Sequence, residues 1–387
     1  MVGGYGDAFV SASYRIVISD PFGTPLADAS DFISLKYARV TNDVSTLTLT
    51  LPSAFNAALL RIPDGRIEVW RRIDGGREYL DTETTWLIKA VEYVRDASGK
   101  VVIVVEADTP LSILGDPGRM SYAYSALWGS NGSGLYLADT FIQLLAFYAL
   151  GDSAANAAAG DYRKIVPQYI TLAAPQGLGA PVSKTFAWRG VLKVMQEIAE
   201  ASTQQGAYIA FDIVAPTPST YQFRTYAYQR GVDHRYSSGI NPVLLSSAFG
   251  NLSETKLRRD YRDMASKVYV GGKGDGASQI ISSRTDTALT TLSPFSLREK
   301  FIECTNSTDE TTLGNEAYAE LRASRPRVTL SGRIIQTPDT LYGVHWQWGD
   351  YVTVQDFGQS FDCRIDAITV TVSNGNELID AWLRGEL

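Results

Sequence analysis

The chain has 387 residues and a formal net charge of -7 at pH 7, and 45% of its residues are hydrophobic. This length allows roughly two or three domains, each able to bury a core. The acidic balance argues against a protein that grips nucleic acid through its phosphates, because that requires a basic face. The two cysteines, Cys304 and Cys363, cannot form a disulfide framework and lack the paired spacing of a zinc site.

Neither a membrane span nor a secretory signal is expected. The longest apolar run, FIQLLAFYAL at residues 141–150, has about half the length that a transmembrane helix needs. The start, MVGGYGDAFV, has no basic segment and no apolar core followed by a small-residue cleavage site. We therefore expect the chain to be made and folded in a cytoplasm.

Short strands joined by tight turns are predicted for residues 1–112. In residues 45–51 (STLTLTL) leucines alternate with threonines, which predicts a strand with one face in a core and one hydroxyl-lined face. Turn residues such as Asp64-Gly65 separate the segments. The other predicted strands are residues 14–19, 33–40, 67–72, 86–94 and 101–106. About six strands joined in this way indicate a small antiparallel β-barrel or sandwich.

Helical spacing replaces strand spacing in the middle of the chain. Apolar residues recur at helical spacing over residues 137–148, and Gly151 is placed to end that helix. A second predicted helix, residues 189–205, has one apolar and one charged face and is followed by Gly206. Two further strands are predicted, residues 207–214 and 221–228. The segment 113–247 is therefore predicted to be an α+β insertion domain.

Strands return in residues 248–387, which we predict to be a second β-barrel domain. One helix interrupts it near residues 309–324, with Leu313, Ala317 and Leu321 as its buried stripe. The strands predicted here are residues 267–271, 280–284, 328–336, 351–355, 361–372 and 378–384. The predicted fold class is mainly β, with two small antiparallel β-barrels and an α+β insertion between them.

A glycine-rich loop, GGKGDG at residues 271–276, is the first candidate site, because such loops can cradle phosphates. In a phosphate-binding loop a Ser or Thr follows the lysine and a helix begins, whereas Gly274 and Asp275 follow Lys273 and strands are predicted on both sides. Asp275 would also repel a phosphate. A hairpin turn whose glycines adopt positive φ is the favoured interpretation.

The second candidate is residues 344–372, where His345, Cys363 and the acids Asp350, Asp356, Asp362 and Asp366 lie close together in sequence. The pattern of β-branched and apolar residues in this segment predicts two strands around a short turn instead of a catalytic site. The apolar residues of the second strand change face beyond Ala367, which requires a β-bulge or burial on both sides. Trp346 and Trp348 leave a sugar-binding aromatic platform as an alternative to a barrel-end or subunit contact.

No catalytic, cofactor-binding or metal-binding residues are predicted. Serine or cysteine catalysis needs a histidine beside the nucleophile, and neither His234 nor His345 lies near a recognisable nucleophile motif. The aspartates that recur every six residues after Asp350 do not have the spacing of a calcium loop. A pair of glycosidase carboxylates stays possible, since the chain has 42 acidic residues, but no pair stands out. We expect a protein that is not an enzyme.

Several segments resemble, in their order and spacing, a family of baseplate hub proteins from long-tailed phages and gene-transfer-agent particles. The resemblance extends over nearly the whole chain. Members of that family are similar to the central hub of contractile tails, where two β-barrels per subunit of a homotrimer form a pseudo-hexameric ring. The segments are TNDVSTLTLTLP (41–52), GRIEVWRR (65–72), VVEADTPLSIL (104–114), GNLSETKLRRDYRDMASKVYVGGKGDG (250–276), SPFSLREKF (293–301) and YGVHWQWGDYVTV (342–354).

This resemblance implies a structural virion protein at the tail tip, assembled in the host cytoplasm. A homotrimer would adapt the six-fold tail tube or a distal tail protein to a three-fold spike or fibre, and would also meet the tape-measure protein. DNA would pass through or be gated there without specific binding. The alternative function is a tail protein that binds or degrades a glycan of the host cell envelope.

Overall fold

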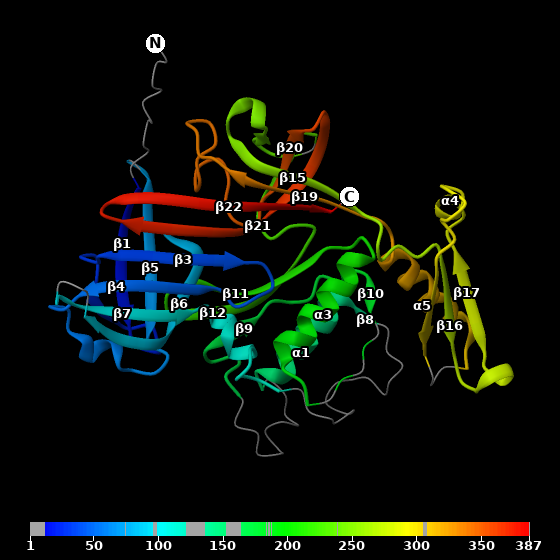
Figure 1. Ribbon diagram of the computed structural model, residues 1–387. Coiled ribbons are helices and arrows are strands. Elements are labelled where there is room, and N and C mark those ends of the chain that lie inside the picture. Colours follow the sequence, from blue (N-terminus) through cyan, green and yellow to red (C-terminus); the bar gives the residue numbers. More distant parts are fainter. Residues whose placement is uncertain are drawn as a thin grey trace, which may run out of the picture.

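The computed structural model describes residues 12–386, apart from residues 74, 96–98, 121–135, 152–163, 183, 185, 187, 238 and 305–307. The start of the chain, where no secretory signal is expected, lies outside the described residues. The described chain is mainly β, as predicted, with few helices (Figure 1). None of the described helices combines the length and hydropathy that crossing a bilayer requires.

One 14-stranded sheet contains the strands of both the first and the last third of the chain. Its path runs β15-β19-β22-β21-β3-β4-β7-β6-β5-β1-β2, and β20 pairs with β21 beside the short strands β13 and β14. Among the described strands the path has free ends at β15 and β2, and no closed barrel is found. These strands are β1 (Ala12–Ser19), β2 (Pro25–Asp28), β3 (Ser34–Val40), β4 (Thr46–Pro52), β5 (Arg66–Ile73), β6 (Tyr79–Arg95), β7 (Val101–Asp108), β13 (Asp233–His234), β14 (Leu244–Leu245), β15 (Leu252–Asp260), β19 (Arg327–Ile334), β20 (Tyr351–Asp356), β21 (Gln359–Ser373) and β22 (Asn376–Glu386).

Strand β21 joins the two ends of the chain. Its first part pairs with β20, its second part pairs with β3, and β22 lies along its other edge. The register against β22 shifts between Ile365 and Ala367. Cys363 and Ile365 are buried before this shift, and Ile368 and Val370 are buried after it. The predicted bulge is therefore confirmed, and the change of face lets one strand serve a single core that spans both sections of the sheet.

The leucines of β4 show why this sheet forms. Leu47, Leu49 and Leu51 are buried, whereas Thr46 and Thr48 between them are exposed. Burial of this one face against the partners of β4, which are β3 and β7, supplies the hydrophobic stabilisation that the alternating pattern predicts.

The middle of the chain packs helices α1 and α3 together around a second core beside the three-stranded sheet β11-β12-β9. Gly206, two residues beyond α3, has a φ of +87°, as expected of a residue that ends a helix. Leu87, Leu111 and Leu114 of the first third also enter this core, so the insertion is anchored to the large sheet. The elements are β8 (Tyr136–Leu137), α1 (Ala138–Ala149), β9 (Ile170–Leu172), β10 (Pro181–Val182), α3 (Val191–Gln204), β11 (Ile209–Thr217) and β12 (Thr220–Ala227).

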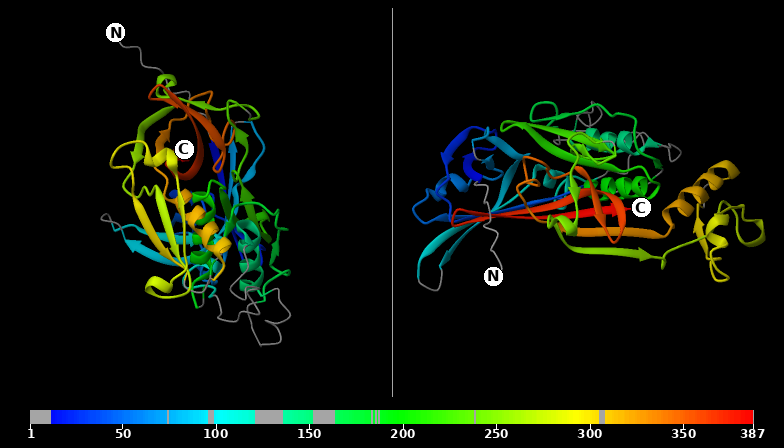
Figure 2. Two further views of the ribbon diagram at one scale, coloured as in Figure 1. Left: turned by 90° about the vertical axis from the view of Figure 1, so that its right-hand side faces the viewer. Right: turned by 90° about the horizontal axis from the view of Figure 1, so that it is seen from above.

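A third, small unit stands out from the body beyond the paired strands β15 and β19, which form one edge of the large sheet (Figures 1 and 2). We call residues 264–325 the outboard unit. Its sheet, in the order β17-β16-β18, is covered by the helix expected near residues 309–324. The GGKGDG loop is a hairpin turn in which Gly274 and Gly276 have positive φ, so that interpretation is confirmed. The elements are β16 (Lys267–Gly271), β17 (Ile281–Thr285), α4 (Thr287–Thr290), β18 (Glu299–Glu303) and α5 (Glu310–Ala323).

Candidate functional site

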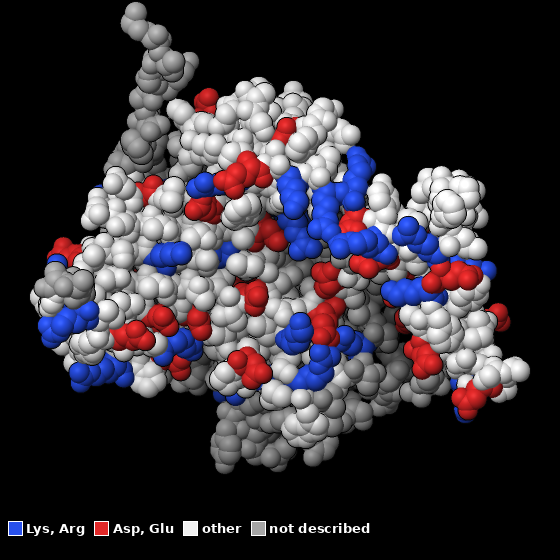
Figure 3. All heavy atoms as spheres, in the orientation of Figure 1, with Lys and Arg blue, Asp and Glu red and all other residues white. Residues whose placement is uncertain are grey.

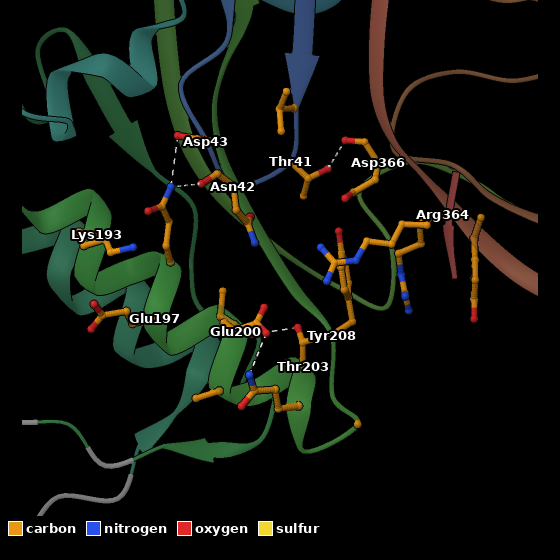
Figure 4. Close-up of a pocket in the computed structure, with 18 residues that line it drawn as sticks. Thr41, Asn42, Asp43, Lys193, Glu197, Glu200, Thr203, Tyr208, Arg364 and Asp366 are labelled. Atoms are coloured by element: carbon orange, nitrogen blue, oxygen red, sulfur yellow. Dashed lines mark hydrogen bonds between the residues drawn. The ribbon is translucent and has the colours of Figure 1, made fainter. Parts of the chain in front are cut away.

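An open groove of about 670 Å³ lies between helix α3 and the large sheet (Figure 4). One wall carries Lys193, Glu197 and Glu200 of α3, and the opposite wall carries Arg364 and Asp366 of β21. Both walls carry cations and carboxylates. The groove therefore has a mixed charge and does not select one ligand charge.

Arg364 is fixed at the wall of the groove by aromatic rings. Its guanidinium carbon lies 3.9 Å from the ring centroid of Tyr208 and 4.6 Å from that of Tyr351. Its Nε donates to the carbonyl of Tyr228 at 2.5 Å. Burial raises the pKa of Tyr208. Because these partners come from β20 and from both ends of the β11–β12 hairpin, Arg364 ties the insertion to the large sheet.

The best-defined carboxylate of the groove is Glu197, and it is not suited to act as an acid. Arg189 donates to it through two nitrogens, and the Lys184 amine lies 2.7 Å away. These bonds, that of Arg189 foremost, lower the pKa of Glu197 to about 2. A general acid in glycoside hydrolysis needs a raised pKa instead. Glu197 is therefore an ionised structural group.

Beneath the sheet surface lies a cluster that we call the buried joint: Arg39, Asp212, Arg230 and Trp348. Asp212 accepts from Arg39 Nη2 at 2.5 Å and from Arg230 Nη2 at 3.3 Å. The two guanidinium groups also lie over the Trp348 ring, at 4.3 and 4.2 Å from its centroid. The Arg39 side chain is only 1% exposed, and burial lowers its pKa. All three parts of the predicted domain order meet in this joint.

The tryptophans proposed as a sugar platform are buried. Trp346 and Trp348 are 1% and 4% exposed, and their Nε1 groups donate to the carbonyls of Thr340 and Asp366. Neither ring offers a free face to a saccharide, so the platform interpretation is wrong. His345 is half-buried, and its Nδ1 accepts from the Leu341 N–H at 2.9 Å.

Of the four candidate aspartates, Asp350 is the one whose carboxylate lies close to a histidine ring. Asp350 is buried, accepts from the N–H groups of Val232 and Gln347 at 2.7 and 2.6 Å, and lies 3.6 Å from His234 Nε2. Burial raises the pKa of Asp350, against the effect of those bonds. The sequence separation of 116 positions between His234 and Asp350 hid this contact; it arises because β13 pairs with β20.

The other acids lie apart. Asp356 accepts from Ser247, and Asp362 accepts from Thr353. The Trp348 indole donates to the Asp366 backbone carbonyl. Over the part of the chain that the structure describes, no group of three or more His, Cys, Asp and Glu could hold a metal ion.

The cysteines are held as neutral thiols. Burial raises the pKa of Cys363 to about 12. Burial also raises the pKa of Cys304. A reactive cysteine would need the opposite shift.

A second polar network was missed by reasoning from the sequence. The Asp81 carboxylate is fully buried and accepts from the hydroxyls of Tyr37 and Tyr342. Nearby, Arg71 donates to the Glu377 carboxylate through Nη2 at 2.8 Å and through Nε at 3.2 Å, and it also donates to the Tyr342 carbonyl. The network links both ends of the chain, and no local pattern marks it.

Comparison with known proteins finds one matching family and several solved structures with a similar fold. The family described as Siphovirus ReqiPepy6 Gp37-like protein matches residues 137–382. Similar solved structures include a tail protein of Neisseria meningitidis (TM-score 0.53, 14% identity, 97% of each chain). The 43 kDa tail protein of prophage MuSo2 from Shewanella oneidensis is also similar (0.54, 15%, 96% of this chain and 98% of that one). Prophage tail protein gp18 of Listeria monocytogenes is similar too, with a TM-score of 0.53 and 13% identity over 96% of this chain and 94% of that one. No sequence among curated proteins matches the chain.

Proposed function

The chain belongs to the Siphovirus ReqiPepy6 Gp37-like family, and from this premise we propose that it is a structural hub protein at the tip of a phage-like tail. The observation that carries the proposal is that a fold shared with solved phage tail proteins covers 96–97% of the chain. The protein is then a virion component and not an enzyme. Residues 1–112 and 248–387 supply its two β sections, and residues 113–247 supply its insertion.

The hub works by symmetry matching. Each chain carries two β sections, joined edge to edge where β3 pairs with β21. A homotrimer of such chains repeats these sections in a pseudo-hexameric ring, which fits the six-fold tail tube or a distal tail protein on one side. The three-fold side receives a spike, a fibre or the tape-measure protein, and DNA passes along the axis.

The organisation of the buried polar groups supports a load-carrying role. The buried joint and the Asp81 network connect segments that lie far apart in sequence, and both are packed inside the protein. Ionic groups in such places fix one arrangement of the parts, because breaking a buried pair leaves an uncompensated charge. A hub that transmits force between tube and spike benefits from such fixed geometry.

Glycan binding or cleavage is the weaker proposal, because the tryptophans that suggested it are buried and Glu197 is held ionised. An image of purified particles that locates the chain at the end of the tube, in a ring of three-fold symmetry, tests the hub. A chain located elsewhere in the particle would overturn it. Saccharide binding by the isolated chain would favour the alternative.

A further inference from the structure

The outboard unit presents an apolar turn that its own core does not use. Leu292, Phe295 and Leu297 follow α4 and are 65%, 84% and 59% exposed. Large apolar side chains gathered in this way on a surface mark an interaction site more often than chance exposure does. Among its described residues, the same unit buries six in its hydrophobic core, and none of these three is among them.

This turn is fixed in position. The Ser296 N–H donates to the Ser293 carbonyl at 3.1 Å, and Pro294 occupies the second position, which suits a tight turn. Below it, the fully buried Ser266 hydroxyl donates to the Ser296 carbonyl at 2.7 Å. The backbone that carries the exposed Phe295 is thus fixed. A side chain on a fixed backbone loses less entropy on binding than one on a mobile loop, which suits an interface anchor.

One cation lies at the base of the turn. Arg298 lies three residues after Phe295, and it lines a shallow hollow together with Arg258, Arg259, Asp260 and Arg262. Asp260 pairs with Arg258 and with Arg262, and Arg259 donates to Gln359, so Arg298 is the cation that the contact can use. Figure 3 shows Lys and Arg side chains gathered over the paired strands β15 and β19, although the chain as a whole is acidic. A partner for this surface should combine an apolar hollow with negative charge.

The chain itself carries such a hollow. An open depression of about 480 Å³ lies between the segment 246–249 and the β20–β21 turn, and Ala248, Phe357 and Asp356 line it. Phe357 and the neighbouring Phe249 are 52% and 61% exposed. Hydrogen bonds, that of the Thr255 hydroxyl foremost, lower the pKa of Asp356, so its carboxylate is anionic. The hollow therefore offers apolar side chains to Phe295 and a negative charge to Arg298.

The two surfaces lie on different units of one molecule: Figure 1 places β20 on the body and α4 at the top of the outboard unit. The geometry points to a contact between copies, in which Phe295 of one chain enters the Ala248–Phe357 hollow of the next, with Arg298 facing Asp356. The contact is head-to-tail, and a head-to-tail contact closes into a ring when the rotation allows. This inference rests on the proposed function, because it names the surfaces that join the trimer.

Sedimentation of the full chain over a range of concentrations tests the contact. Phe295→Ser should weaken self-association by roughly thirtyfold or more, as expected for a central aromatic anchor. Phe22→Ser is the matched control, because Phe22 is 63% exposed in the turn between β1 and β2. Equal dissociation constants for Phe295→Ser and the unmodified chain would overturn the inference.

A mixing experiment checks the direction of the contact. Ala248→Trp fills the hollow and should also prevent ring formation. An equal mixture of Phe295→Ser and Ala248→Trp chains retains one intact pair of surfaces, so it should form dimers and no larger species. Monomers alone in the mixture would contradict the contact. An unmodified chain that never associates would overturn the trimer as well, whereas a trimer indifferent to both substitutions would overturn only this inference.

Discussion

The large sheet and the outboard unit are built in opposite ways. The sheet takes its core from strands at both ends of the chain, from Ile16 to Leu383. The outboard unit takes its core from one continuous segment, between Ala265 and Leu321. Contacts between distant segments make the sheet a single cooperative structure, whereas a unit with a small local core can open by itself.

The two regions also differ in where their ion pairs lie: buried in the body and exposed in the outboard unit. The body buries Arg39 of the large sheet against Asp212 of β11 in the insertion, and these side chains are 1% and 5% exposed. In the outboard unit Lys300 pairs with Glu320 at the surface, where these side chains are 47% and 25% exposed. Removing one partner of a buried ion pair lowers the free energy of unfolding by about 3–5 kcal/mol, whereas a surface ion pair contributes about 1 kcal/mol or less. The body should therefore keep its geometry while the outboard unit adapts to a partner.

The largest effect should come from Asp212→Ala. This change leaves Arg39 and Arg230 as buried cations that no longer share an anion, and the free energy of unfolding should fall by about 3–5 kcal/mol. Denaturant unfolding followed by circular dichroism measures it. Glu78→Ala, which removes the surface partner of Arg15, is the control and should cost about 1 kcal/mol or less. Equal losses for the two variants would mean that the joint does not hold the body together.

Leu313→Ala should open the outboard unit alone. Leu313 is fully buried between α5 and the sheet, and such a truncation costs about 2–5 kcal/mol. Hydrogen exchange should accelerate in β16, β17, β18 and α5 and stay unchanged in the large sheet. Leu49→Ala is the matched change in the body and should accelerate exchange across the whole sheet. Faster exchange in the body of Leu313→Ala would show that the two regions unfold together.

Tyr342→Phe should have a smaller effect on the body. It removes one hydroxyl donor from the buried Asp81 carboxylate and leaves that of Tyr37, so the free energy of unfolding should fall by about 1–3 kcal/mol. Thermal or denaturant unfolding measures this. Tyr236→Phe, at a side chain that is 68% exposed, should leave stability unchanged. A Tyr342→Phe variant as stable as the control would remove the Asp81 network from the interactions that hold the ends of the chain together.

Local signals in the sequence were sufficient for individual elements. The alternation in residues 45–51, the GGKGDG hairpin and the helix before Gly206 all depend on neighbours in sequence, and the structure has each of them. The bulge near Ala367 was also visible, because a change of face within one strand has few physical causes.

Long-range pairing was not visible. Nothing in β3 or β21 alone specifies that they pair, since many strands of similar pattern compete for the same edge. The burial of Trp346 and Trp348 depends on that same assembly, and so does the contact of His234 with Asp350. Residues at the candidate site were therefore identified by type, but their roles followed only from tertiary structure.

The smallest expected effect concerns Glu197, at the edge between the insertion and the sheet. Its pKa is lowered to about 2 in the folded chain from an ordinary 4.5, so its stabilisation is present above about pH 4.5 and is lost as the pH falls toward 2. Because the Arg189–Glu197 ion pair is partly exposed, it contributes about 1 kcal/mol or less to the free energy of unfolding. Glu197→Gln should therefore flatten the loss of stability on acidification, while Glu200→Gln, where an amide is the partner, should not. The free energy of unfolding of both variants and of the unmodified chain is measured between pH 2 and pH 5. If Glu197→Gln and the unmodified chain show the same dependence on pH, the wall of the groove is held by packing and not by this ion pair.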